Sequence, residues 1–123
     1  MNATLWITQG LLALAFIYSG VLKSTQTKER MIAVGQTGVR PFSLPVIRFT
    51  AICELLAVVG LILPWSTGIA RVLTPLAAVG LAVLMVLAGN VHARQHEPRN
   101  VATNVVLLAL CIFVAVGRFA GLS

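Results

Sequence analysis

Four long apolar runs, separated by polar or basic segments, make up most of this 123-residue chain. The runs cover residues 5–22, 46–63, 69–90 and 101–120. A helix needs about 20 apolar residues to cross the roughly 30 Å hydrocarbon core of a bilayer, so each run is long enough to span a membrane. The pattern therefore predicts an all-α fold, an integral membrane four-helix bundle formed by a single domain over residues 1–123.

The composition excludes the main alternatives to a membrane protein. Hydrophobic residues are 59% of the chain and charged residues only 10%, whereas soluble domains carry about 25% charged residues. Disordered chains are poor in apolar residues, and a disulfide-rich scaffold needs more than the two cysteines found here. The first run has no basic segment before it and no cleavage motif of small residues, so we expect a retained helix and not a signal peptide.

Basic residues are concentrated around two of the three connections, 23–45 and 91–100. The chain has nine Lys and Arg against three acidic residues, a net charge of +6. The side that holds these connections carries seven of the nine: Lys23, Lys28, Arg30, Arg40, Arg48, Arg94 and Arg99. Since positive charge favours the inner side of a membrane, we expect both connections in the cytoplasm and both termini outside. We expect the cell membrane, in a bacterium the inner membrane, with lipid head groups and not nucleic acid as the partner of this charge.

The sequence leaves the structure of one segment open and makes a specific prediction at each of two prolines. Residues 27–34 form either a short amphipathic helix on the membrane surface or an irregular loop held near lipid by its basic residues. The second run stops at Pro64, where the sequence predicts the end of a helix. Pro75 lies about two turns into the third run, where a proline removes a backbone hydrogen bond and tends to kink a helix.

Glu54 is the most informative polar residue, because it lies well inside the second run. Eight residues into a helix place it about 12 Å along the axis. A carboxyl at that depth is costly unless it is paired or neutral, and such groups commonly mark functional sites in membrane proteins. The alternative is a structural hydrogen bond that joins two helices, and the sequence leaves both interpretations open.

Other polar residues are expected at the same end of the bundle as Glu54. If the runs alternate in direction, a polar cavity open to the cytoplasm would be lined by Ser19, Lys23, Arg48, Glu54, Asn90, His92 and Asn104. Polar groups that converge inside a helical bundle are candidates for ligand binding or proton handling. The alternative for Lys23 and Arg48 is that each extends to lipid head groups.

No metal site or catalytic motif emerges from the remaining residues. His92 and His96 have the i, i+4 spacing of a metal pair, but two arginines lie nearby and no further ligand is close in sequence, so we predict no metal. Cys53 and Cys111 lie inside apolar runs without a paired motif and are expected to be packing residues. The sequence leaves open whether the protein is an enzyme.

The order of several short motifs resembles the DoxX-like family of small four-helix membrane proteins. The matching segments are Phe16–Lys23, Cys53–Ala57, Gly60–Pro64, Leu73–Ala78 and His92. The resemblance implies a four-helix membrane protein, with the family's recurring polar positions at Ser19, Lys23, Glu54 and His92. The family takes its name from a subunit linked to thiosulfate:quinone oxidoreductase, and other relatives resemble chaperone-like assembly proteins.

Three functions are compatible with these observations. The first is a ligand-binding accessory subunit of a membrane redox or quinone-linked system, with a quinone or a lipid near Glu54. The second is a non-catalytic assembly factor or scaffold with a membrane protein partner, or a homo-oligomer. The third, ranked below the others, is a small proton-coupled transporter in which Glu54 titrates. No cofactor is certain from the residues alone.

Overall fold

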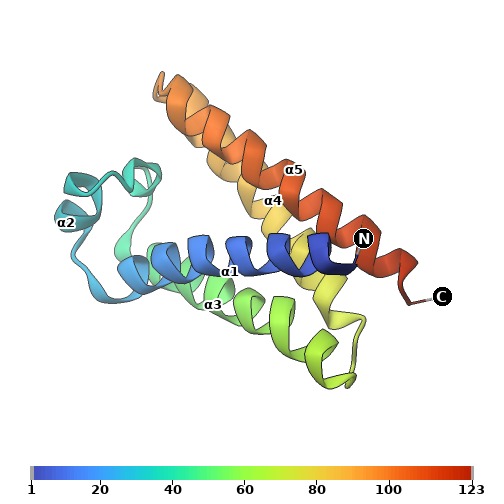
Figure 1. Cartoon of the computed structure of the whole chain (residues 1–123). Helices are drawn as coiled ribbons and strands as arrows, with labels where there is room; N and C mark the ends of the chain where they lie inside the picture. Colours follow the sequence, from blue (N-terminus) through green and yellow to red (C-terminus); the bar gives the residue numbers. More distant parts are fainter. Residues whose placement is uncertain (1, 123) are drawn as a thin grey trace.

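A computed structural model describes residues 2–122 and contains four long helices (Figure 1). These are α1 (Asn2–Thr25), α3 (Leu44–Thr67), α4 (Leu73–Arg94) and α5 (Pro98–Ala120). Between α1 and α3 lie the short helix α2 (Lys28–Ala33) and the 3-10 turn η1 (Thr37–Val39). All four long helices have the length and hydropathy needed to cross a membrane, which confirms the predicted all-α membrane bundle.

The long helices form two antiparallel pairs that cross. Helix α1 lies along α3, and α4 lies along α5 (Figure 1). The pairs meet near the N-terminus of α1 and the C-terminus of α5, and they diverge toward the end that carries α2 and η1 (Figure 1). Gly117 and Gly60 permit the close approach, since a Cβ at these positions would lie 2.6 Å from Leu5 and 3.0 Å from Ala77.

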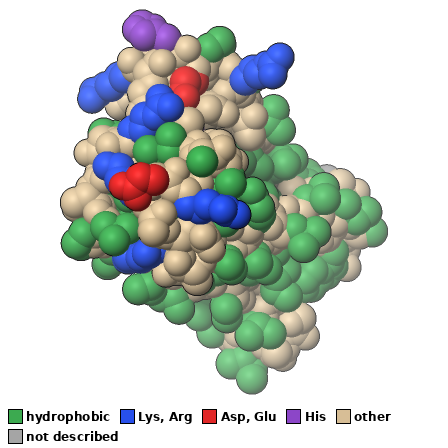
Figure 2. Space-filling model, turned by 90° about the vertical axis from the view of Figure 1, so that its left-hand side faces the viewer, with side chains coloured by type: hydrophobic (Ala, Val, Ile, Leu, Met, Phe, Trp, Pro, Cys, Tyr) green, Lys and Arg blue, Asp and Glu red, His purple; other side chains and the backbone are tan. Residues whose placement is uncertain are grey.

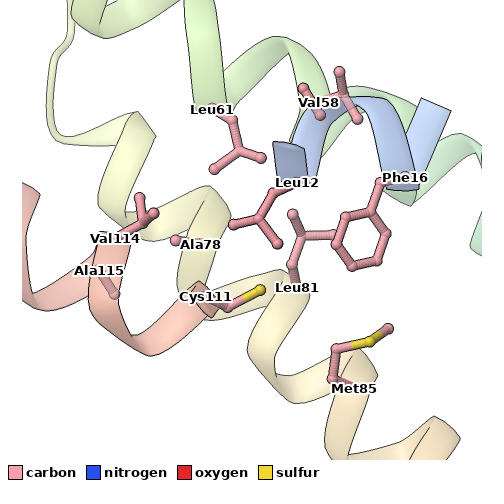
Figure 3. Packing of buried hydrophobic residues seen from close by; sticks show 11 residues of the cluster. Leu12, Phe16, Val58, Leu61, Ala78, Leu81, Met85, Cys111, Val114 and Ala115 are labelled. Atoms are coloured by element: carbon pink, nitrogen blue, oxygen red, sulfur yellow. The ribbon is translucent and has the colours of Figure 1, made fainter. Parts of the chain in front are cut away.

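An apolar core joins the two pairs in the middle of the bundle. Leu12 and Phe16 from α1 point toward Leu81 of α4 and Cys111 of α5 (Figure 3). Cys111 is fully buried in this cluster, in agreement with a packing role. Large apolar side chains elsewhere on the long helices face outward, as expected for helices surrounded by lipid.

Charged side chains gather at the α2–η1 end of the molecule. Figure 2 shows this face, on which basic, acidic and histidine side chains lie together while apolar side chains cover the visible flanks. For residues 27–34 the sequence left open a short helix or an irregular loop, and the structure has the short helix α2 there. Its Met31 is fully buried against Val39 and Ile47, so its apolar side packs on the protein.

The predictions for the two prolines were wrong. Helix α3 does not end at Pro64 but continues to Thr67, and Pro75 is the third residue of α4. In the first turn of a helix a proline loses no hydrogen bond, so Pro75 needs no kink. Ile69 to Val72, which the sequence placed in the third run, form turns before α4 begins.

Pro64 lacks the N–H that would bond the carbonyl of Gly60, four residues earlier. The hydroxyl of Thr74, a residue of α4, donates to this carbonyl at 2.8 Å. The amide of Gln9, on α1, donates to the next carbonyl, that of Leu61. Side chains of α4 and α1 therefore bond carbonyls of α3 close to the missing N–H of Pro64. The bond from Thr74 also links the two helix pairs.

Candidate functional site

A cavity of about 450 Å³ lies between the diverging helix pairs. All four long helices line it, and residues of the segment 35–42, which includes η1, cover its wide end. Most of the lining is apolar, with Phe16, Ile47 and Leu84 among its walls. Tyr18 and Leu87 line the cavity but are 58% and 57% exposed, so part of its wall reaches the outer surface of the bundle.

An ion pair between Lys23 and Glu54 lies in the wall of this cavity. The Nζ atom of Lys23 donates to Oε1 of Glu54 at 2.8 Å. The side chain of Glu54 is only 2% exposed and that of Lys23 17% exposed, so the pair is largely removed from solvent. Glu54 is thus charge-compensated within the bundle, and Lys23 does not extend to lipid head groups.

One carboxylate oxygen of Glu54 is not used by this ion pair. Its Oε2 atom is buried and has no hydrogen-bond partner among the described residues. Lys23 donates through one of its three N–H groups to Glu54, and no other bond from Nζ is found among these residues. The pair therefore retains unused hydrogen-bonding capacity, a buried acceptor on Glu54 and donors on Lys23.

The predicted polar residues divide into those that line the cavity and those that do not. Five of the seven line it: Ser19, Lys23, Glu54, His92 and Asn104. Asn90 is exposed on α4 and does not line the cavity. Arg48 is also outside the lining, where its Nη1 donates to the backbone carbonyl of Lys23 at 2.7 Å. Arg48 thereby bonds the C-terminal end of α1 and does not extend to lipid head groups.

Hydrogen bonds of Glu97 with His92 and Thr37 join the segment that covers the cavity to the α4–α5 connection. The Nδ1 atom of His92 lies 2.8 Å from Oε1 of Glu97, which also accepts from the hydroxyl of Thr37 at 2.9 Å. Asn100 in turn donates to Thr37. We call Thr37, His92, Glu97 and Asn100 the mouth cluster. The hydrogen bond with His92, and then that with Thr37, lowers the pKa of the Glu97 carboxyl from its usual value.

Several polar lining residues were missed by the sequence analysis. These are Tyr18, Gln36, Thr50, Asn100 and Thr103. Helical spacing in the sequence could have indicated some of these residues. Thr50 lies one turn before Glu54 on the same helix face, and Asn100, Thr103 and Asn104 have i, i+3, i+4 spacing. Gln36 had no such signal, because the path of an irregular connection is not encoded in periodicity.

The spacing of His92 and His96 does not place them on one helical face. Helix α4 ends at Arg94, and His96 has a positive φ of 59°, so its exposed side chain follows a turn and not a helix. Among residues 2–122 no group of three or more His, Cys, Asp or Glu is arranged to hold a metal ion.

Comparison with known proteins identifies a family for this chain. The sequence profile of the DoxX-like family matches residues 7–114, which include all of α3 and α4, most of α1 and α5, and every residue of the ion pair and the mouth cluster. Neither curated proteins nor solved structures give a match to this chain.

Proposed function

The chain belongs to the DoxX-like family, and we propose that this multi-pass membrane protein is a ligand-binding accessory subunit of a membrane redox or quinone-linked system. The observation that carries the proposal is the Lys23–Glu54 pair, with its unused Oε2 atom, in the wall of a mostly apolar cavity. Cavities with apolar walls and a few convergent polar groups are typical of small-molecule sites.

The chemistry of the pair favours an uncharged amphipathic ligand. Lys23 and Glu54 carry opposite charges at 2.8 Å, so an additional ligand charge would have no partner in the pair. The Oε2 atom of Glu54 can accept a hydrogen bond from a hydroxyl, and Lys23 can donate to a carbonyl oxygen. A quinone or quinol ring offers these groups, and its apolar tail would lie against aliphatic side chains such as Leu84 and Leu87. A lipid with a neutral polar head is the second candidate of the same class.

Access from the membrane also supports an apolar ligand. Tyr18 on α1 and Leu87 on α4 line the cavity and face outward. A molecule dissolved in the bilayer can therefore reach the ion pair without crossing the aqueous phase.

The experiment that tests this function is analysis of the small molecules that copurify with the full chain in mild detergent. We expect native mass spectrometry and extraction to show a bound quinone or lipid. Its occupancy should fall at least tenfold in Glu54→Gln, because the charged acceptor is lost. The matched control is Glu29→Gln, which changes an exposed acid on α2 and should leave occupancy unchanged.

Two results would contradict the proposal. Equal occupancy in wild type, Glu54→Gln and Glu29→Gln would show that the ion pair does not hold the ligand. A stable protein partner without any small molecule would favour an assembly factor instead. The double variant Lys23→Met/Glu54→Gln separates loss of binding from unfolding, since it removes both charges together and leaves no buried charge unpaired.

A further inference from the structure

A buried arginine lies at the end of the bundle opposite the cavity. Arg118, in the last turn of α5, is 3% exposed. Its Nε donates to the Oε1 atom of Gln9 at 2.7 Å, and its Nη1 donates to the Oδ1 atom of Asn2 at 2.8 Å. Its Nη2 atom is buried and has no hydrogen-bond partner among residues 2–122. The guanidinium thus retains unused donor capacity.

A second arginine shares an aromatic ring with Arg118. The Cζ atom of Arg118 lies 4.5 Å from the centroid of the Trp65 ring, and that of Arg71 lies 4.1 Å from the same centroid. Trp6 also lies beside Arg118, at 5.2 Å. Arg71 itself is exposed. Two positive charges are therefore held close together, one buried and one at the surface.

No acidic side chain compensates these charges. The three acids of the chain are Glu29, Glu54 and Glu97, and all three lie at the α2–η1 end or in the wall of the cavity. The hydrogen bonds to Gln9 and Asn2 and the contacts with tryptophan are formed with neutral groups. A buried charge near a second like charge is costly without an opposite charge close by. The two positive charges therefore have no acidic side chain close by, and an anion from outside the chain would be favoured here.

We propose that Arg71, Trp65 and Arg118 form a binding site for the phosphate group of an anionic membrane lipid. Guanidinium groups match phosphate oxygens in geometry and charge. Trp65 lies in the last turn of α3 and Arg71 in the α3–α4 connection, at a helix end where the polar head groups of the bilayer are expected. The buried Nη2 of Arg118 supplies an unused donor, and exposed Arg71 supplies the charge nearest to the head group. This site is separate from the Lys23–Glu54 cavity and does not depend on it.

The test compares lipid retention by the full chain under native mass spectrometry. Protein in neutral detergent is mixed with equal amounts of phosphatidylglycerol and phosphatidylcholine. We expect wild type to retain phosphatidylglycerol preferentially. We expect Arg71→Gln to reduce that preference about fivefold, the effect of one basic residue near an anionic membrane surface. Arg94→Gln, which removes an exposed arginine at the other end, is the matched control.

One further variant, Arg118→Lys, and inorganic phosphate as a soluble competitor distinguish the possible outcomes. Arg118→Lys retains the charge without the planar fork, and it should lose part of the preference while the protein remains folded. Equal retention of the two lipids by wild type would overturn the proposal, as would equal effects of Arg71→Gln and Arg94→Gln. Binding of inorganic phosphate without any preference between the lipids would show a phosphate site and overturn the lipid assignment.

Discussion

At the scale of single residues, two polar groups are explained by the partners that the bundle provides. Glu54 is compensated by Lys23, and Thr74 replaces a donor that Pro64 cannot provide. Both contacts link different helices, and both involve groups that lipid cannot solvate. Removing one partner leaves the other buried without a hydrogen bond, so it lowers the free energy of unfolding more than removing both partners does.

Glu54→Gln alone should destabilise the protein, because it leaves the positive charge of Lys23 largely buried without a partner. We expect a loss on the order of 3 kcal/mol in the free energy of unfolding. Lys23→Met/Glu54→Gln should recover most of that loss. Denaturation in detergent, followed by circular dichroism, measures both. A double variant less stable than Glu54→Gln would show that the pair is not the source of the effect.

Thr74→Ala should cost about 1 kcal/mol, since the carbonyl of Gly60 then has no donor. In a Pro64→Ala background the cost should shrink, because alanine restores the N–H that bonds this carbonyl within α3. A double-mutant cycle in the same unfolding assay measures the coupling between the two positions. Thr67→Ala is a control at an exposed threonine of α3 whose hydroxyl bonds its own helix. Additive effects of Pro64→Ala and Thr74→Ala would contradict this account.

At the scale of elements, the cover of the cavity belongs to one helix pair and is bonded to the other. The segment with α2 and η1 connects α1 to α3, while Thr37 of η1 bonds Glu97 beside α5. The mouth cluster therefore holds the cover to the α4–α5 pair, while Met31 and Val39 hold it to α3. Because Glu97 accepts these bonds as a carboxylate, its lowered pKa means that the bonds favour the deprotonated form.

Acid should release the cover. A carboxyl whose pKa is lowered in the folded protein contributes stability that is present above its ordinary pKa and lost as the pH falls through the lowered value. We therefore expect the Glu97 carboxyl, followed by NMR, to titrate with a pKa below its ordinary value.

Two variants rank the causes of this shift. His92→Gln should raise the pKa of Glu97 most, and Thr37→Val should raise it less, following the order of their contributions. Unchanged titration in both variants would show that the mouth cluster does not hold the Glu97 carboxylate.

At the scale of the whole molecule, the architecture followed from the sequence and the detailed pairing did not. Four apolar runs were enough to predict the four-helix membrane bundle, because length and hydropathy decide membrane crossing. Helix alternation also brought Ser19, Lys23, Glu54, His92 and Asn104 to one cavity. It misplaced Asn90, which faces outward, since rotation of a helix about its axis depends on packing that a nearly uniform apolar sequence does not reveal.

The contacts at the other end of the bundle were not predicted. In the sequence, Gln9 is a single polar residue in the first apolar run, and Arg118 is a single charge near the end of the fourth. Their bond joins residues 109 positions apart, which no local pattern can indicate. For the same reason, the role of Thr74 became visible only when α3 was found to continue through Pro64.

The distribution of basic residues predicts the orientation of the whole molecule in the membrane. We expect the cover of the cavity in the cytoplasm and the α3–α4 connection outside. Single cysteines at Ser43 and Ser66, both exposed, report the two sides once Cys53 and Cys111 are replaced by alanine. A membrane-impermeant thiol reagent added to intact cells should label Ser66→Cys and leave Ser43→Cys unlabelled. The reverse pattern would invert the orientation.

The crossing of the two helix pairs has a mechanical consequence. Contacts at Gly60, Thr74, Gln9 and Arg118 hold the pairs together at one end, and the apolar core joins them in the middle. From Gly60 to the start of α3 the helix forms a lever arm of roughly 20 Å, so a rotation of about 3° moves its far end by about 1 Å. A rotation of this kind would widen the cavity, and both the apolar core and the mouth cluster restrain it. Lateral pressure in the bilayer acts on both arms of this lever, so the lipid composition itself would set the width of the cavity.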